Sequence, residues 1–327
     1  MRKTPKPIPR WKQWRFRLEV AVLVVWVTMV GWLPRGVVRR LGACLGVGMF
    51  YVLGHQRRVA LANLAIAFPD QSPAEHQRIA RQSFANAFGT VMTMFWTGRS
   101  AADEVGRYVD NAEEFRRFKA HENGHGLILL TLHYGDWELL GLASGASGLP
   151  VTVVARELPN RELARRLTAL RALTGNVMIP QHRAVQRLFQ ALRRGETAAM
   201  LADLNARRET GGVWVNFFGL PVFNHNSVAA LAVRTGAPIC LLIAEPLPQG
   251  RVRIHNGGLI KYQPTGAYEQ DVQRVSQLCA DASEAAIRAR PELWLWSYRR
   301  WRHRPTPAQG RYPFYSSYKD MGISPPA

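Results

Sequence analysis

Short apolar runs of strand length recur along the chain and restrict its fold more than any other feature. The run Gly126–Leu132 (GLILLTL) is apolar at almost every position, as in a strand that is covered on both faces. Similar runs recur at Val151–Ala155, Ala198–Ala202 and Pro238–Ala244. Amphipathic segments lie between them, including Arg161–Thr174 and Ala184–Arg194. Because strands and helices alternate, the sequence predicts an α/β fold with a central mixed sheet flanked by helices.

Local signals add elements on either side of this core. Ser72–Glu75 is a capping box with proline at the first helical position, so we expect a helix that runs to about Trp96. Another long helix is expected at Val272–Arg290, and further strands are expected at Val213–Phe217 and Arg251–His255. The last stretch, from residue 304 onward, is rich in Pro, Ser and Tyr, which is typical of an irregular tail or a docked arm.

The N-terminus resembles a signal anchor, because a basic arm without acids precedes the apolar run Val20–Leu33. Pro34 and Arg35 follow this run at once, so we expect no cleavage. The run is shorter than the roughly 20 residues that a spanning helix needs. Together with the apolar stretch Leu41–Gly54, it can form a shallow membrane hairpin with arginines between the two segments. The alternative is that one or both stretches are ordinary buried helices.

The charge balance narrows the possible partners. The chain has 43 Lys and Arg against 23 Asp and Glu, so nucleic acid, anionic lipid and phosphorylated substrates all fit its charge. Nucleic-acid binding would explain the positive charge but no other feature, because the sequence has no helix-turn-helix, RNP-like or zinc signature. We therefore expect no nucleic acid partner. The scattered cysteines, Cys44, Cys240 and Cys279, indicate neither a disulfide framework nor a metal cluster.

A histidine at the end of the first apolar run is the strongest candidate for chemistry. A helix begins within four residues of His133, and ligand-facing residues of α/β folds gather at such strand ends. His133 and Glu138 on one helix would lie on different faces, at about 100° per residue, so His133 must precede the helix. With Gly135 allowing a turn and Asp136 near the N-cap, the Glu138 carboxylate can reach one ring nitrogen and leave the other to accept a proton. The alternative is a surface histidine satisfied by the helix cap.

The segment His-Tyr-Gly-Asp-Trp-Glu at 133–138 resembles the H-x4-[D/E] motif of glycerolipid and lipid A acyltransferases, and the chain as a whole is similar to the lipid A late acyltransferase family. The likeness continues over most of the sequence, at Asn63–Pro69, Val154–Arg156, Arg171, Asp203, Phe217–Gly219, Ala232–Pro238 and Glu292–Trp301. It implies a glycerolipid acyltransferase-like fold and a hydrophobic N-terminal membrane anchor. The implied domains are 1–55, a basic arm and anchor; 56–304, the catalytic acyltransferase domain; and 305–327, an irregular tail.

The resemblance implies O-acyl transfer from an acyl thioester to a hydroxyl of a lipid A precursor or related glycolipid. The donor is acyl carrier protein or coenzyme A, and no cofactor is needed beyond this co-substrate. The resemblance also implies that the protein is located at the cytoplasmic side of a bacterial inner membrane, where it contacts an anionic lipid surface. His133 would be the general base and Glu138 would orient it. The alternatives are another phospholipid or glycolipid acceptor, hydrolysis of the thioester, or a catalytically idle scaffold at the membrane surface.

Three further residues are candidates for substrate binding, each with a plainer alternative. Arg156 follows a predicted strand and can clamp a phosphate, or be a solvated surface arginine. Arg171 can bind substrate at the site, or it can belong to a basic helix face beside Arg165 and Arg166. Asp203 ends the predicted strand Ala198–Ala202 and can support the site or cap a turn.

Other polar clusters suggest weaker interpretations. His121 and His125 have i, i+4 spacing, but Gly124 indicates a loop and no third ligand is evident, so we expect no metal. His225 lies in a turn that departs from the family pattern, as does Asn205–Arg208, which leaves the acceptor open. The aromatic and basic segment from Trp294 to Arg304 fits either an interfacial helix end or a tryptophan core with a solvated basic edge.

Overall fold

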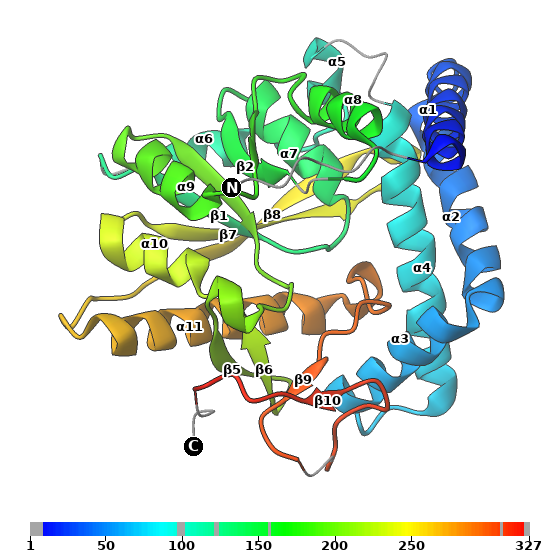
Figure 1. Ribbon diagram of the computed structural model, residues 1–327. Helices are drawn as coiled ribbons and strands as arrows, with labels where there is room; N and C mark the ends of the chain where they lie inside the picture. Colours follow the sequence, from blue (N-terminus) through cyan, green and yellow to red (C-terminus); the bar gives the residue numbers. More distant parts are fainter. Residues whose placement is uncertain (1–8, 97–101, 121–123, 156–157, 308–309, 324–327) are drawn as a thin grey trace.

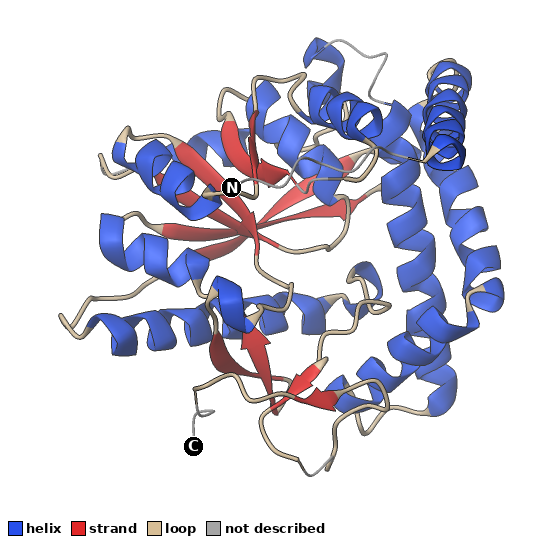
Figure 2. Ribbon diagram, in the orientation of Figure 1, coloured by secondary structure: helices blue, strands red, loops and turns tan. Residues whose placement is uncertain are grey.

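A six-stranded mixed sheet forms the centre of the molecule, as the alternation of apolar runs predicts. The computed structural model describes residues 9–96, 102–120, 124–155, 158–307 and 310–323. The sheet order is β3-β2-β4-β1-β7-β8, and every neighbouring pair is parallel except β7 with β8. Figure 2 shows the strands in red among the blue helices. The strands are β1 (Leu127–Thr131), β2 (Val151–Ala155), β3 (Val177–Pro180), β4 (Thr197–Leu201), β7 (Ile239–Pro246) and β8 (Val252–Ile260).

Helices cover both faces of this sheet because alternate residues of each strand point to opposite sides. In β1, Ile128 and Leu130 join one core cluster, while Leu127 and Leu129 join the other. The first core includes residues of α9 (Ala184–Arg193), α10 (Ser227–Thr235) and α11 (Tyr268–Ala289) (Figure 1). The second includes residues of α5 (Ala102–Gly106), α6 (Glu113–Lys119) and α7 (Trp137–Ala146). The helix α8 (Arg161–Arg171) follows β2.

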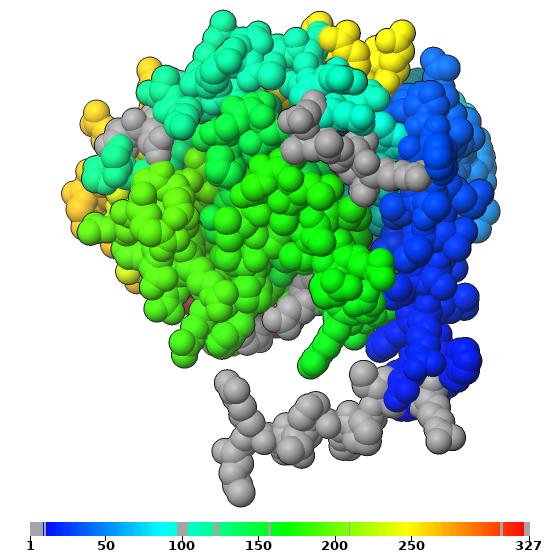
Figure 3. Space-filling view, turned by 90° about the horizontal axis from the view of Figure 1, so that it is seen from above, coloured from blue at the N-terminus to red at the C-terminus, as the bar shows by residue number. Residues whose placement is uncertain are grey.

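The described chain begins with the helices α1 (Arg10–Val30), α2 (Arg35–Val52), α3 (Gly54–Ala67) and α4 (Pro73–Trp96), and α5 and α6 follow them before β1. The helix α2 packs closely along α4, because Gly42 and Gly46 bring the two backbones together. The helix α1 forms a ridge along one edge of the molecule (Figure 3). Among the described helices none is long and apolar enough to cross a membrane by itself, whereas α2 and α3, bent by 92° at their junction, pass that test as a pair.

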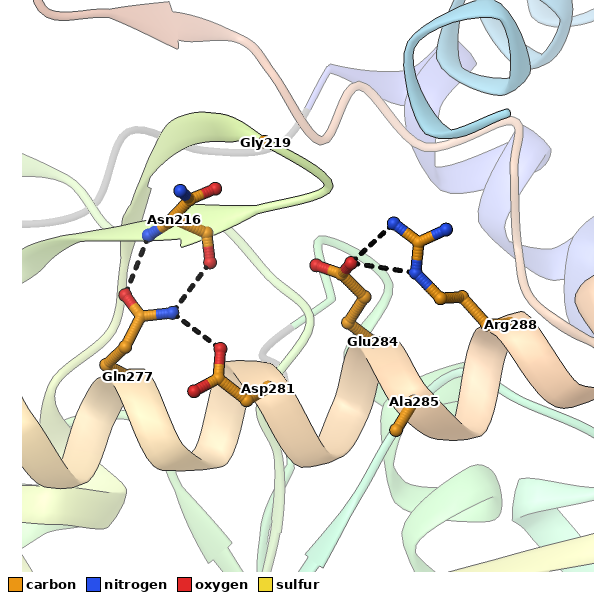
Figure 4. A pocket seen from close by; sticks show the side chains of 7 residues that line it. All are labelled: Asn216, Gly219, Gln277, Asp281, Glu284, Ala285 and Arg288. Carbon is orange, nitrogen blue, oxygen red and sulfur yellow. Dashed lines mark hydrogen bonds and ion pairs between the residues drawn. The ribbon is translucent and has the colours of Figure 1, made fainter. Parts of the chain in front are cut away.

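A hairpin and a C-terminal arm complete the fold. The hairpin strands β5 (Val213–Phe217) and β6 (Leu220–Asn224) lie over α11, where the Gln277 carboxamide bonds both backbone groups of Asn216 (Figure 4). In the arm, β9 (His303–Arg304) pairs with β10 (Ser317–Tyr318). Short 3₁₀ helices lie at Arg208–Thr210, Pro248–Gly250 and Pro291–Leu293. Because the Trp214 indole donates to the Ile323 carbonyl, the described end of the chain is a docked arm.

The interfacial interpretation of the segment from Trp294 to Arg304 is wrong. Trp294, Trp296 and Trp301 are fully buried and belong to the main core, next to the aromatic rings of the β5–β6 hairpin. Arg300 is buried with them and donates to Asn224 Oδ1 at 3.0 Å. This segment is therefore a tryptophan core, and its aromatic rings are not available to a lipid headgroup layer.

Candidate active site

The site forms where the parallel strands β1 and β4 end side by side. Thr131 is in register with Leu201, and His133 and Asp203 each lie two residues further along their chains. The carboxyl ends of neighbouring parallel strands meet at one edge of a sheet, so the two side chains reach the same place. Because each residue lies the same distance past the end of its strand, a histidine and an aspartate that are 70 residues apart in the sequence come into contact.

His133 is held by Asp203 through two hydrogen bonds. Asp203 Oδ1 lies 2.8 Å from His133 Nδ1, and Oδ2 accepts the His133 backbone N–H at 2.8 Å. The Trp294 indole also donates to Oδ2, at 3.0 Å. Because a buried carboxylate accepts at Nδ1, the neutral ring carries its proton there and presents the Nε2 lone pair. The side chain is 24% exposed, and no described residue hydrogen-bonds its Nε2.

The charges around this pair raise the proton affinity of His133 against the effect of its burial. Burial lowers the pKa of His133, but the charge and hydrogen bond of Asp203, with the nearby Glu138, outweigh burial and the opposing charge of Arg171. The net result is a raised pKa. Burial raises the pKa of Asp203, and the hydrogen bonds from His133 and Trp294 reverse this, so that its pKa is lowered. The pair is thus built to hold an imidazolium beside a carboxylate.

Glu138 does not orient His133, and the expected contact between them is wrong. Its carboxylate instead accepts two bonds from Arg171, from Nε at 2.9 Å and from Nη2 at 2.6 Å. The first turn of α7 directs Glu138 toward α8, which carries Arg171, while the end of β4 supplies the carboxylate for the histidine. Sequence reasoning placed Asp203 near the site, but as a supporting or turn-capping group.

The turn between His133 and α7 requires glycine. Gly135 has a φ of +58°, and a Cβ at this position would lie 1.9 Å from the Ala244 carbonyl oxygen. Its N–H donates to the Leu293 carbonyl at 2.9 Å. Its own carbonyl accepts from Asn86 Nδ2 at 3.1 Å and from Thr90 Oγ1 at 2.9 Å, both on α4. The backbone of the turn is therefore held by three hydrogen bonds, with Leu293, Asn86 and Thr90.

Asp136 caps α7 as expected, but it is also completely buried and paired with two arginines of α2. Its Oδ1 accepts the Leu139 N–H at 3.2 Å. Its Oδ2 lies 2.7 Å from Arg35 Nη2 and 3.2 Å from Arg39 Nη1. Both belong to the arginines between the two apolar runs of the sequence, and their guanidinium groups point inward to this carboxylate. Their i, i+4 spacing puts them on one face of α2, and this was the sequence signal for a common partner.

Three candidates remain from the sequence analysis, and the structure describes one of them. Arg156 and His121 lie outside the described residues. His225 is partly buried, and burial lowers its pKa, as do the neighbouring charges of Arg300 and Arg207. Among the described residues, no group of three or more His, Cys, Asp or Glu side chains can hold a metal ion.

Two surface hollows, of about 550 and 480 Å³, lie elsewhere, over α11 and the β5–β6 turn. They share Gly219 and Arg288 in their linings, and neither is lined by His133, Asp203 or Glu138. Figure 4 shows that polar side chains of the first hollow bond one another, Glu284 with Arg288 and Gln277 with Asp281. Both pairs lie within α11, and the same Gln277 and Glu284 also bond the hairpin, at the backbone of Asn216 and at the Phe218 N–H.

A sequence model of the bacterial lipid A biosynthesis acyltransferase family matches residues 10–303. The chain belongs to this family. The resemblance carried by the motif at 133–138 is thereby confirmed. As a member of this family the protein is an acyltransferase, as the sequence predicts.

Individual relatives differ in how much of the chain they match. The lauroyltransferase of lipid A biosynthesis from Escherichia coli is 22% identical over 311 residues, covering 92% of this chain and 95% of that protein. The palmitoleoyltransferase of the same organism is 23% identical over 307 residues, with the same coverage. The phosphatidylinositol mannoside acyltransferase of Mycolicibacterium smegmatis is 27% identical over 192 residues, 58% of this chain. The match spans 61% of that mycobacterial protein's length.

Proposed function

We propose that the protein is a membrane-associated O-acyltransferase that moves a fatty acyl chain from an acyl thioester to a hydroxyl of a lipid A precursor or related glycolipid. The observation that carries this proposal is the geometry of His133, whose Nδ1 is fixed by Asp203 while Nε2 is open. Membership of a lipid A acyltransferase family supports the reaction class. The donor is acyl carrier protein or coenzyme A, and the place is the cytoplasmic side of a bacterial inner membrane.

In this reaction His133 acts as the general base. Its Nε2 takes the proton of the acceptor hydroxyl while the oxygen attacks the thioester carbonyl. Asp203 stabilises the imidazolium that forms and keeps the ring in place. Collapse of the tetrahedral intermediate breaks the C–S bond, and the thiolate takes the proton from the imidazolium. No covalent enzyme intermediate is needed.

The oxyanion of that intermediate needs hydrogen-bond donors. In the turn from His133 to Asp136, which we call the catalytic turn, the N–H groups of Gly135 and Asp136 already donate to the carbonyls of Leu293 and Ala244. The N–H of Leu139 is taken by Asp136. We assign the role to the first two amides of α7, at Trp137 and Glu138, where the positive end of the helix dipole favours negative charge.

A comparison favours a second candidate for the acceptor. A relative that acts on phosphatidylinositol mannoside aligns over more than half of this chain. A mannosylated phospholipid is therefore the alternative acceptor, with the same base and the same donor class. A catalytically idle scaffold on this fold is distinguished by the variants below.

The test is a transfer assay on detergent-solubilised protein. Radiolabelled acyl carrier protein and coenzyme A thioesters are offered to a Kdo-bearing lipid A precursor and, separately, to a mannosylated phosphatidylinositol. His133→Ala is expected to lose transfer by about 10²–10⁴-fold, the usual contribution of a general base. His255→Ala is the control, because that histidine pairs with Glu245 on the surface. Transfer retained in His133→Ala contradicts the proposal, and thioester cleavage that proceeds equally without acceptor indicates a hydrolase.

A further inference from the structure

The buried charges around Asp136 do not balance. Arg35 is 1% exposed and Arg39 is 14% exposed, yet of the described carboxylates only Asp136 pairs with either guanidinium. A buried charge without a partner is costly. Burial accordingly lowers the pKa of Arg39, and the charge of Arg35 adds to that effect against the attraction of Asp136. One arginine would satisfy the carboxylate, so the second calls for another explanation.

Arg39 differs from Arg35 in what else it holds. Its Nη2 donates to Asn86 Oδ1 at 2.7 Å, and its Nη1 lies 3.5 Å from Thr90 Oγ1. Asn86 and Thr90 are the two residues of α4 that donate to the Gly135 carbonyl. The guanidinium therefore contacts both supports of the catalytic turn, the cap residue Asp136 on one side and the donors to Gly135 on the other.

We infer that Arg39 is a positioning residue for the acyl transfer, because its guanidinium fastens the turn that carries His133 to α2 and α4. The inference rests on the proposed function. The planar fork of arginine has donors on two nitrogens and can hold Asp136 and Asn86 together, which a single ammonium does less well. A base displaced by about 1 Å loses on the order of 10²-fold in rate.

The turn is coupled to the base through the backbone. Asp203 hydrogen-bonds both the ring and the backbone N–H of His133, which lies two residues before Gly135. A turn that is no longer held in place therefore weakens both of these bonds. Other groups facing His133 are Glu138, Arg171 and the Trp137 ring, whose centroid lies 5.5 Å away. With Asp203 loosened, the His133 pKa falls, because burial, which lowers it, remains.

Arg39→Met is the decisive variant because it leaves a balanced pair. Arg35 and Asp136 remain together with one charge each, so we expect folding to survive the change. The matched control is Arg40→Met, at the next position of α2, whose side chain is exposed. Arg39→Lys keeps the charge and loses the fork. Thermal unfolding of each variant verifies that the comparison is made on folded protein.

Two readouts separate positioning from stability. In Arg39→Met we expect kcat to fall by about 10–100-fold with the donor KM unchanged. The His133 ring signal, assigned by its loss in His133→Gln, should titrate at lower pH in Arg39→Met than in the unsubstituted protein. In Arg39→Lys, both kcat and the pH at which His133 titrates should lie between those of Arg39→Met and the unsubstituted protein. The inference is overturned if Arg39→Met has the same kcat as Arg40→Met and its His133 titrates at the same pH as in that control.

The titration also separates this inference from the proposed function. If the unsubstituted protein transfers no acyl chain to any acceptor, the proposed function fails. The His133 signal still reports whether Arg39 holds the turn, since it needs no substrate. A titration that is identical in the presence and absence of the Arg39 guanidinium overturns the positioning role, whatever reaction the site performs.

Discussion

At the scale of single residues, the carboxylate of Asp203 sets both the orientation and the proton affinity of His133. In Asp203→Asn the attraction is lost while burial remains, so the His133 pKa falls. A general base works above its pKa, so the acid limb of the kcat/KM profile should move to lower pH in this variant. We also expect kcat to fall by about 10²–10⁴-fold, because the amide neither fixes the tautomer nor stabilises the imidazolium. A pH profile with an unchanged acid limb contradicts this assignment.

The ion pair between Glu138 and Arg171 affects the same histidine with opposite signs. Glu138 raises the pKa of His133 and Arg171 lowers it, although burial and Asp203 have larger effects. Glu138→Gln should therefore shift the acid limb of kcat/KM to lower pH, and Arg171→Gln should shift it to higher pH. Arg165→Gln is the control, because that arginine is exposed on α8 and pairs with Glu162. Shifts of the same sign in the two variants would show that the pair acts through structure and not through charge.

The sequence predicted the positions of the site residues but not their pairing. His133 and Asp203 each follow an apolar run, and this signal places both at strand ends. Which runs become neighbours depends on the order of the strands, and β4 lies next to β1 although β2 and β3 come between them in the chain. A local argument therefore chose the nearer carboxylate, Glu138. The choice of partner was decided by sheet topology, which one sequence does not reveal.

At the scale of elements, α2 and α4 approach so closely that glycine is needed at their contact. A Cβ on Gly46 would lie 2.4 Å from the Phe84 carbonyl oxygen, whereas a Cβ on Gly48 meets nothing within 4 Å. We expect Gly46→Ala to destabilise the protein by about 1–3 kcal/mol through overpacking. Gly48→Ala should stabilise it by about 0.5–1 kcal/mol, since alanine is the better helix former. Thermal or denaturant unfolding measures both, and equal effects of the two substitutions would refute the close contact.

Elements with a strong local signal were predicted, and those that depend on their surroundings were not. The strand β2 and the helix α4 lie where the apolar run and the capping box place them. The strand β3 was missed because it is at the edge of the sheet, where Val177 is exposed and no continuous apolar run is needed. The aromatic segment from Trp294 was ambiguous because the same tryptophans suit a lipid interface and a protein core. Only the packing of the hairpin against it distinguishes the two.

At the scale of the whole molecule, α1 and α2 form an edge with an apolar outer surface. Trp14, Leu18 and Trp32 are exposed near α1, and Leu41 and Leu45 are exposed on α2. The inner side of α2 carries the arginines that hold Asp136. One helix therefore contacts the catalytic turn on one side and presents apolar side chains on the other. Such a patch next to basic residues is typical of a surface that binds anionic lipid, so a bilayer bound there would lie close to the site.

This arrangement predicts that vesicle binding and catalysis can be separated. The double variant Trp14→Ser and Trp32→Ser should lower binding to phosphatidylglycerol vesicles about tenfold or more, because two large apolar side chains no longer enter the lipid. Binding should also weaken at high salt, since Lys12 and Arg17 lie on the same helix. Transfer to a detergent-dispersed acceptor should remain, because both side chains are largely exposed, Trp14 by 70% and Trp32 by 74%.

The control for this experiment removes exposed apolar side chains far along the sheet. Val177→Ser with Leu259→Ser changes exposed residues of the two edge strands, β3 and β8. Sedimentation with vesicles measures binding for both double variants. If the control loses as much binding as the tryptophan variant, attachment comes from general surface hydrophobicity. If only the tryptophan variant loses binding and its transfer from detergent persists, the helix edge is the membrane contact, and lipid enters the site from the side on which α2 holds the catalytic turn.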